Sequence, residues 1–263
     1  MSEHGRPAHP ARTADGALLD WEEQGSGEPM LLIPGQAVSR RTWDILLPRL
    51  ADGFRVITYD HRGIGASTMG APADWTTRML AADAVAVLDA AGARSAHIVG
   101  HSMGGRVAQW LALERPERVA SLTLISATGG DARGTARPAA ATRALAGGDP
   151  DVLGPYFFGA AFRAQHPDVL GLLARGDTRL RARRGHYQAS SSHDTWDELD
   201  RICVPTLVVH GADDAITPAA NGRAMADRIR GAEYLEVPGG HGVHLEDPTV
   251  AAALRAFASR HPA

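Results

Sequence analysis

The run Gly100-His101-Ser102-Met103-Gly104 lies between an apolar strand pattern at 96–99 and a helix pattern at 105–113. The spacing G-x-S-x-G in this context predicts a sharp strand-to-helix turn that projects the Ser102 hydroxyl above a sheet. We attribute the flanking glycines to the tightness of the turn, which leaves no room for side chains. The helix start behind the serine also favours negative charge that develops beside it.

Short apolar runs alternate with helical segments along most of the chain. The predicted parallel strands are 30–33, 55–59, 96–99, 121–125, 206–210 and 234–237, and 18–23 is expected to add an antiparallel strand. Helical patterns cover 76–90, 219–229 and 249–258. Because strands buried on both faces appear as short apolar runs, this order predicts an α/β fold with a doubly wound, mostly parallel sheet.

One stretch breaks this alternation, since no strand pattern appears between about residues 128 and 197. A loop of that length without structure is implausible in a compact domain. We therefore predict a helical cap insertion at 128–197, between two parts of one core at 1–127 and 198–263. It should cover the sheet edge where open α/β folds bind ligands. Its apolar residues are expected to roof a pocket or to pack the insertion onto the sheet: Leu153, Tyr156, Phe157, Phe158, Phe162, Leu170, Leu172 and Leu173.

The composition of the chain argues against nucleic acids and membranes as binding partners. The 263 residues carry a formal net charge of −3 and include no lysine, which gives no electrostatic case for binding nucleic acid. No segment is apolar and long enough to span a membrane, and the polar run 1–12, interpreted as a loose tail, lacks the apolar stretch of a secretory signal. The single cysteine, Cys203, is interpreted as a packed core thiol. We expect a cytoplasmic protein that acts on a small molecule; the oligomeric state stays open.

A serine hydroxyl needs a base within hydrogen-bond reach, and the base needs an acid that orients it. Asp214 follows the strand at 206–210, and His241 follows the strand at 234–237. Ser102 likewise follows a strand. One edge of the sheet can therefore bring the three side chains together, as catalytic nucleophile, acid and base.

Four motifs carry a resemblance to the α/β-hydrolase fold family, and in particular to its serine esterases and lactonases. They are Pro34-Gly35-Gln36, the run from Asp60 to Ser67, the turn around Ser102, and the two segments that hold Asp214 and His241. The resemblance covers nearly the whole chain outside the insertion. It implies a Ser-Asp-His triad in the order along the chain that this family uses. The run from Asp60 to Ser67 does not match a phosphate-binding loop, so we interpret Asp60 and Arg62 as structural residues that fix the loop beneath the active site.

The acid has three candidates. The resemblance implies Asp214, which stands three residues after the glycine of a His-Gly-x-x-Asp segment. Its neighbour Asp213 is expected to cap the loop. Asp131, which follows the preceding strand, is the remaining alternative.

The base is predicted to be His241, which stands behind two glycines as the family's base does. His244 is interpreted as a loop-packing or supporting histidine. The two could form an H-x-x-H metal pair, but further ligands at suitable spacing are missing, so we expect no metal and no cofactor. His186 and His193, in the insertion, are expected at the surface.

An oxyanion hole needs two backbone N–H donors. The family pattern implies the N–H of Met103, directly after the nucleophile, and the N–H of Gln36. Here the sequence departs from the family, because Pro34-Gly35 stands where a His-Gly pair is common. The histidine that normally helps to hold this loop is missing, which puts the loop's shape in question.

These residues predict a serine hydrolase that cleaves a carboxylic ester, lactone or thioester of a small molecule through an acyl-enzyme. The same triad also serves carbon–carbon bond hydrolysis, acyl transfer and cofactor-free haloperoxidase chemistry. A further alternative is a module that binds a small ligand with little turnover.

Overall fold

The computed structural model describes residues 10–71, 74–174 and 180–263. Within these residues, seven strands form the central sheet in the order β3-β5-β4-β6-β7-β8-β9. Only β3 runs antiparallel to its neighbour, and the other neighbouring pairs in this sheet are parallel. The strands are β3 (Trp21–Gln24), β4 (Glu28–Ile33), β5 (Phe54–Tyr59), β6 (Ala96–His101), β7 (Val119–Ile125), β8 (Thr206–Gly211) and β9 (Glu233–Val237).

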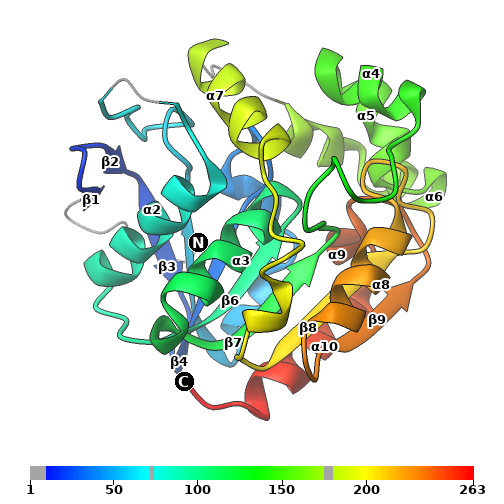
Figure 1. Ribbon diagram of the computed structural model, residues 1–263. Coiled ribbons are helices and arrows are strands. Elements are labelled where there is room, and N and C mark those ends of the chain that lie inside the picture. The colour runs from blue at the N-terminus through cyan, green and yellow to red at the C-terminus, as the bar shows by residue number, and fades with distance from the viewer. Residues whose placement is uncertain (1–9, 72–73, 175–179) are drawn as a thin grey trace.

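Helices cover both faces of this sheet (Figure 1). Thr76 begins one of them by accepting a hydrogen bond from the Met79 N–H at 3.1 Å, and Asp247 caps another at the Thr249 N–H. The α-helices of the core are α1 (Leu47–Ala51), α2 (Thr77–Ala90), α3 (Met103–Glu114), α8 (Ala219–Arg228), α9 (Val243–Glu246) and α10 (Pro248–Ser259). Three short 3-10 helices lie at Arg40–Trp43, Pro116–Arg118 and Leu199–Arg201.

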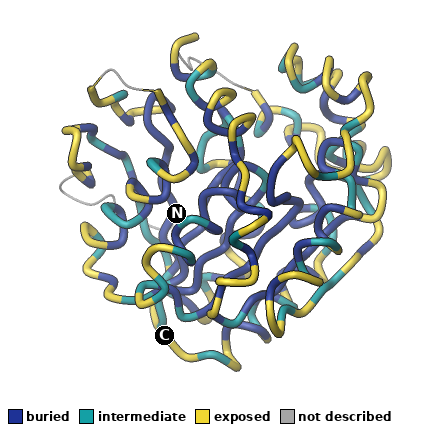
Figure 2. Tube along the Cα trace, in the orientation of Figure 1, coloured by how far each residue is buried: buried dark blue, intermediate teal, exposed yellow. Residues whose placement is uncertain are grey.

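The alternation of side chains along the strands builds two apolar cores, one on each face. In β4, Leu31 and Ile33 face the core that α2 and α3 cover, whereas Met30 and Leu32 face the core beneath α1 and α10. The central strands are buried along almost their whole length (Figure 2). The doubly wound, mostly parallel sheet predicted from the sequence is therefore confirmed.

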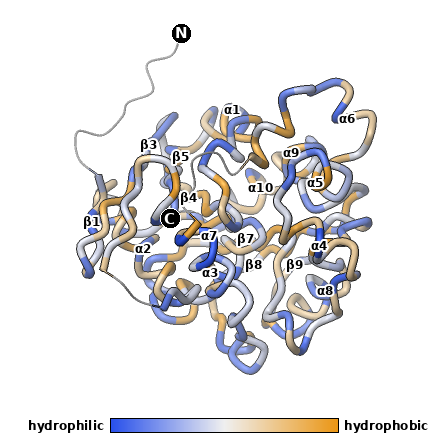
Figure 3. The backbone as a smooth tube through the Cα atoms, turned by 90° about the horizontal axis from the view of Figure 1, so that it is seen from above, coloured by the Kyte–Doolittle hydropathy of each residue, from blue (hydrophilic) through white to orange (hydrophobic). Residues whose placement is uncertain are grey.

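The segment between β7 and β8 is helical where it is described. It contains α4 (Ala139–Gly147), α5 (Pro150–Phe157), α6 (Ala160–Gln165), a 3-10 helix at Pro167–Leu173 and α7 (Leu180–Ser191). These helices lie together at one end of the sheet (Figure 1), with the hydrophilic α7 over its middle and α4 to α6 towards β9 (Figure 3). An antiparallel bridge between Gly130 and Asp194 joins the two ends of the segment. The boundaries 128–197 stay a prediction.

Two expectations near the sheet need correction. The run 18–23 is divided at Asp20 into β2 (Leu18–Leu19) and β3, and β2 pairs with β1 (Ala11–Arg12), so the last residues of the predicted tail are in a strand. The rest of that tail, 1–9, lies outside the described residues. Cys203 is exposed, not packed in the core. Its neighbours Ile202 and Val204 are buried, and in an extended segment the side chain between two inward ones points out.

Among the described residues, no helix combines the length and apolar character that crossing a membrane requires.

Candidate active site

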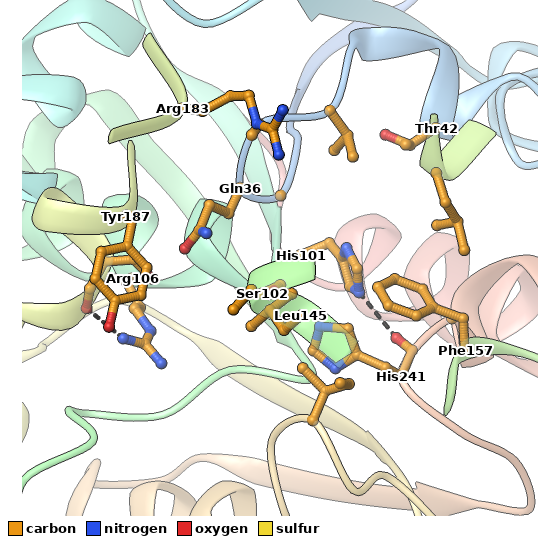
Figure 4. A pocket seen from close by; sticks show the side chains of 18 of the residues that line it. Gln36, Thr42, His101, Ser102, Arg106, Leu145, Phe157, Arg183, Tyr187 and His241 are labelled. Carbon is orange, nitrogen blue, oxygen red and sulfur yellow. Dashed lines mark hydrogen bonds between the residues drawn. The ribbon is translucent and has the colours of Figure 1, made fainter. Parts of the chain in front are cut away.

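Ser102 sits on the predicted turn, between the end of β6 and the start of α3. Its backbone is strained, with φ 56° and ψ −118°, a region that a residue with a side chain rarely adopts. A Cβ at Gly100 would overlap the Gly104 carbonyl group, and a Cβ at Gly104 would overlap the Ile33 carbonyl oxygen. Both glycines are therefore required by close backbone contacts, and the tight turn that they allow presents Ser102 to the pocket (Figure 4).

Asp214 and His241 form a buried pair after β8 and β9. The Nδ1 atom of His241 lies 2.8 Å from Oδ2 of Asp214, and the other carboxylate oxygen accepts the N–H groups of Ile216 at 2.9 Å and Thr217 at 2.8 Å. Burial raises the pKa of Asp214, but the nearby His241 and the hydrogen bond to it outweigh burial and hold that pKa below its usual value. The Asp214 carboxylate is therefore ionised and fixed in one orientation.

The other two acid candidates lie elsewhere. Asp213 is exposed, and its contact to the last loop is made by its backbone N–H, which donates to the Gly239 carbonyl oxygen at 2.9 Å. Asp131 forms an ion pair with Arg106 at 2.6 Å. The structure thus brings Asp214, of the three carboxylates, to His241.

The loop that carries His241 is anchored to the segment between β7 and β8. The N–H groups of His241 and Gly242 donate to the carbonyl oxygens of Tyr156 and Phe157, both at 2.9 Å. Tyr156 and Phe157 end helix α5. The position of the imidazole consequently depends on α5 as well as on the sheet.

Two further histidines lie close to His241. His101 Nε2–H donates to the His241 carbonyl oxygen at 2.8 Å (Figure 4), and the His101 and His244 rings lie 4.2 Å apart between centroids. Burial, with the charge of His241 as a smaller cause, lowers the pKa of His101 to about 3. A neutral His101 therefore supports the loop that carries His241. His244 packs beside it, in line with its interpretation from the sequence as a loop-packing histidine.

The loop after β4 is held by histidines in spite of Pro34. His61 Nε2–H donates to the Pro34 carbonyl oxygen at 3.1 Å. On the other side of the loop, the Ala37 N–H donates to Nδ1 of His186 at 3.2 Å, and Nε2–H of His186 donates to the Arg62 carbonyl oxygen at 3.2 Å. The bond that Nδ1 of His186 accepts needs a neutral ring, and burial lowers the pKa of His186 to about 3. Burial also lowers the pKa of His61 to about 4.

The two predicted oxyanion donors come from the loop after β4 and from the start of α3. Gln36 is in the loop between Pro34 and Ala37 and lines the pocket. Met103 is the first residue of α3, where backbone N–H groups have no partner within the helix. Gly35, next to Gln36 in the chain, borders Ser102, since a Cβ at Gly35 would lie 3.6 Å from the Cβ of Ser102, in ordinary van der Waals contact.

Ion pairs fix the loop after β5. Arg62 is buried and donates from Nε to Asp83 at 2.7 Å and from Nη1 to Asp15 at 2.8 Å. Arg40 bonds the Asp60 carboxylate through its backbone N–H at 2.7 Å and through Nη1 at 2.8 Å. Asp60 and Arg62 thus hold this loop through ion pairs, as the structural interpretation of the sequence expected.

A pocket of about 410 Å³ opens above Ser102, lined by Ser102, His241, Gln36 and side chains of the helical segment. Of the apolar residues predicted to roof it, four line it: Phe157, Phe158, Leu172 and Leu173. Phe157 lies across the pocket beside His101 and His241 (Figure 4). A volume of this size accommodates a small molecule.

The sequence model described as the alpha/beta hydrolase fold matches residues 28–248. The chain belongs to this family. It is 35% identical over 255 residues to "Putative carbamate hydrolase RutD" of Variovorax paradoxus, across 90% of this chain and 92% of the relative. The esterase RhEst1 of Rhodococcus sp. ECU1013 superposes with a TM-score of 0.84 at 26% identity, covering 97% of this chain and 99% of its own. The enol-lactonase of Burkholderia xenovorans LB400 superposes with a TM-score of 0.80 at 25% identity, covering 92% and 96%. The chain is thus an α/β-hydrolase with hydrolase relatives.

For two histidines of this α/β-hydrolase, the predicted exposure to solvent was wrong. His186 and His193, expected at the surface, are both buried. His193 bonds Thr77 on α2 at 2.8 Å, and His186 faces the loop after β4. The error arises because this stretch is hydrophilic in sequence, yet His186 on α7 and His193 just after α7 both face the core. The role of His61 was also missed, although it stands inside the motif from Asp60 to Ser67.

Among the described residues of this α/β-hydrolase, no three histidine, cysteine or acidic side chains are grouped as metal ligands.

Proposed function

We propose that this α/β-hydrolase cleaves a carboxylic ester, lactone or thioester of a small molecule through an acyl-enzyme on Ser102. The observation that carries the proposal is the strained turn that presents Ser102 to the same pocket as the buried His241–Asp214 pair. Carbamates, esters and enol-lactones, named for the three relatives, share a carbonyl group bonded to oxygen, which supports this choice of substrate.

In the proposed reaction, Ser102 Oγ attacks the carbonyl carbon while His241 Nε2 takes the hydroxyl proton. Asp214 holds the Nδ1–H and stabilises the imidazolium that forms. The backbone N–H groups of Gln36 and Met103 bind the oxyanion. His241 then protonates the leaving alcohol or thiol, and the carbonyl re-forms as an ester of Ser102. Water, deprotonated by His241, attacks this ester, and Ser102 recovers its proton as the acid leaves.

We also propose that residues 128–197 act as a cap on this site. The bridge between Gly130 and Asp194 joins the ends of the segment, and Phe157 and Leu173 within it line the pocket. The bonds from the His241 loop to Tyr156 and Phe157 give the cap a part in holding the base.

The proposal is tested with a fluorophosphonate probe and a 4-nitrophenyl ester. We expect one adduct on Ser102, found by mass spectrometry, and a loss of about a thousandfold or more in kcat for Ser102→Ala, because the remaining site lacks the nucleophile. The control Ser192→Ala changes an exposed serine after α7. This variant should still form the adduct on Ser102 and keep its kcat.

Full esterase activity in Ser102→Ala would overturn the proposal. Folded protein that forms no adduct and hydrolyses no ester would instead favour the ligand-binding alternative.

A further inference from the structure

The charge of the pocket differs from that of the chain. The described lining residues include four arginines, Arg106, Arg137, Arg183 and Arg184, and one carboxylate, Asp131. Burial keeps the pocket histidines His101 and His244 neutral by lowering their pKa values. A cationic pocket on a chain with a net charge of −3 marks a site that selects charge.

Two of these arginines have their charge satisfied or lie in solvent. Arg106 forms the ion pair with Asp131 at 2.6 Å and also donates to the Ser190 carbonyl oxygen. Arg184 is exposed. The positive charge of Arg106 or Arg184 therefore needs no anionic ligand as a partner.

Arg137 is different. It is half-buried, its Nε donates to the Ile216 carbonyl oxygen, and no described carboxylate forms an ion pair with it. Burial is the largest cause of a lowered pKa at Arg137, and it outweighs the opposing charges of Asp131 and Asp214. Since Ile216 also bonds Asp214, Arg137 stands on the side of the pocket nearest the acid loop.

Arg183 provides a second such cation from helix α7. It is half-buried and has no ion pair with a described carboxylate, and its guanidinium lies above Gln36 in the close view of the pocket (Figure 4). A guanidinium presents a planar set of donors that matches a carboxylate, and such a charged hydrogen bond is stronger in a partly buried site.

We propose that the substrate carries a carboxylate at some distance from the carbonyl group that Ser102 attacks, and that Arg137 and Arg183 bind this carboxylate. The substrate class is then a half-ester of a small dicarboxylic acid or a lactone that bears a free carboxylate. The apolar residues Phe157 and Leu172 contact the chain between the two ends. This inference rests on the proposed function.

The test compares 4-nitrophenyl hydrogen adipate with 4-nitrophenyl hexanoate, which lacks the second carboxylate. We expect kcat/KM to favour the adipate half-ester by about tenfold or more in the natural protein. Arg137→Gln and Arg183→Gln should each reduce this ratio about tenfold, because each removes a hydrogen bond to a charged group. Arg137→Lys keeps the charge and should retain part of the preference, whether or not the glutamine variant folds.

Matched controls are arginines that do not line the pocket. Arg143→Gln, on α4, and Arg181→Gln, on the same helix as Arg183, remove an equal charge from exposed positions and should leave the ratio unchanged. An equal loss in these variants would indicate a long-range charge effect and overturn the assignment. A natural protein that hydrolyses the adipate half-ester and the hexanoate ester with equal kcat/KM would overturn it as well. A higher kcat/KM for the 4-nitrophenyl ester of 5-phosphonopentanoate than for the adipate half-ester would also overturn it, because the site would then prefer a phosphonate to a carboxylate.

Binding separates this inference from the proposed function. In Ser102→Ala, calorimetry should detect adipate but not adipamide, and the binding of adipate should be lost in the double variants with Arg137→Gln or Arg183→Gln. If this holds while the natural protein hydrolyses no ester, the carboxylate site stands and the hydrolase proposal fails. If the natural protein hydrolyses the ester but Ser102→Ala does not bind adipate, the hydrolase proposal stands and the carboxylate site fails.

Discussion

Asp213 and Asp214 are adjacent carboxylates in different environments. Asp214 is buried, with both oxygens bonded, whereas Asp213 is exposed. The backbone N–H groups of Ile216 and Thr217 fix the Asp214 carboxylate before any substrate arrives. An acid in this state can orient the imidazole without taking its proton.

We predict that Asp214→Asn lowers kcat by about a thousandfold to ten-thousandfold. The amide can donate to Nδ1 of His241, and this favours the tautomer whose Nε2 carries the proton and cannot act as a base. Steady-state kinetics with a 4-nitrophenyl ester measure the change. Asp213→Asn is the matched control and should keep kcat within about twofold. Equal losses in the two variants would contradict the assignment of the acid.

At the scale of elements, the loop after β4 is held between the loop after β5 and helix α7. His61 bonds the loop at Pro34, and His186 bonds it at Ala37. His186 also bonds the Arg62 carbonyl oxygen, and Arg62 is tied to Asp83 on α2. The proposed oxyanion donor Gln36 is therefore positioned by side chains from two other segments.

We predict that His186→Phe lowers kcat about tenfold and changes KM less, because the Ala37 N–H loses its acceptor and the loop around Gln36 becomes less defined. His186→Gln offers a carbonyl acceptor and should recover part of the rate. Gln188→Ala, on the exposed side of α7, is the control.

Kinetics of these three variants on one ester decide the prediction. A rise in KM alone in His186→Phe would show that His186 affects the pocket and not the oxyanion loop.

The whole molecule contains several buried histidines that stay neutral. Burial lowers the pKa from 6.5 to about 4 for His61 and to about 3 for His101 and His186. The unfolded chain binds protons at these rings near pH 6.5, and the native state binds them only near pH 3 to 4. Stability from these groups is therefore fully present above about pH 6.5 and is lost as the pH falls towards those native values.

We predict that the free energy of unfolding falls between about pH 6.5 and 4, by up to about 1.4 kcal/mol per pH unit for each such histidine. Urea denaturation at a series of pH values measures the slope. His186→Gln removes one titrating ring and should make the slope shallower by that amount. An unchanged slope in this variant would show that His186 does not hold its pKa low.

Local sequence determined much of the fold. The strands and the helices of the core follow the predicted apolar runs, because the spacing of apolar residues along a short stretch of sequence determines which of them are buried. The turn around Ser102 was predictable for the same reason, since two glycines and the serine act within five positions. The burial of Cys203 and His186 was predicted wrongly, because the direction of each side chain depends on how a short segment packs against the rest of the molecule.

The sequence alone determined the α/β architecture, the place of Ser102 and the order in which Asp214 and His241 follow it. Only the tertiary structure decided which carboxylate reaches His241, how a loop with Pro34 is held, and that Arg137 and Arg183, which pair with no described carboxylate, line the pocket. The bond from Ala37 to His186 joins residues 149 positions apart, and no local pattern encodes such a contact. Local periodicity sets the elements, whereas the packing of the segment after β7 onto the sheet sets the surroundings of the site.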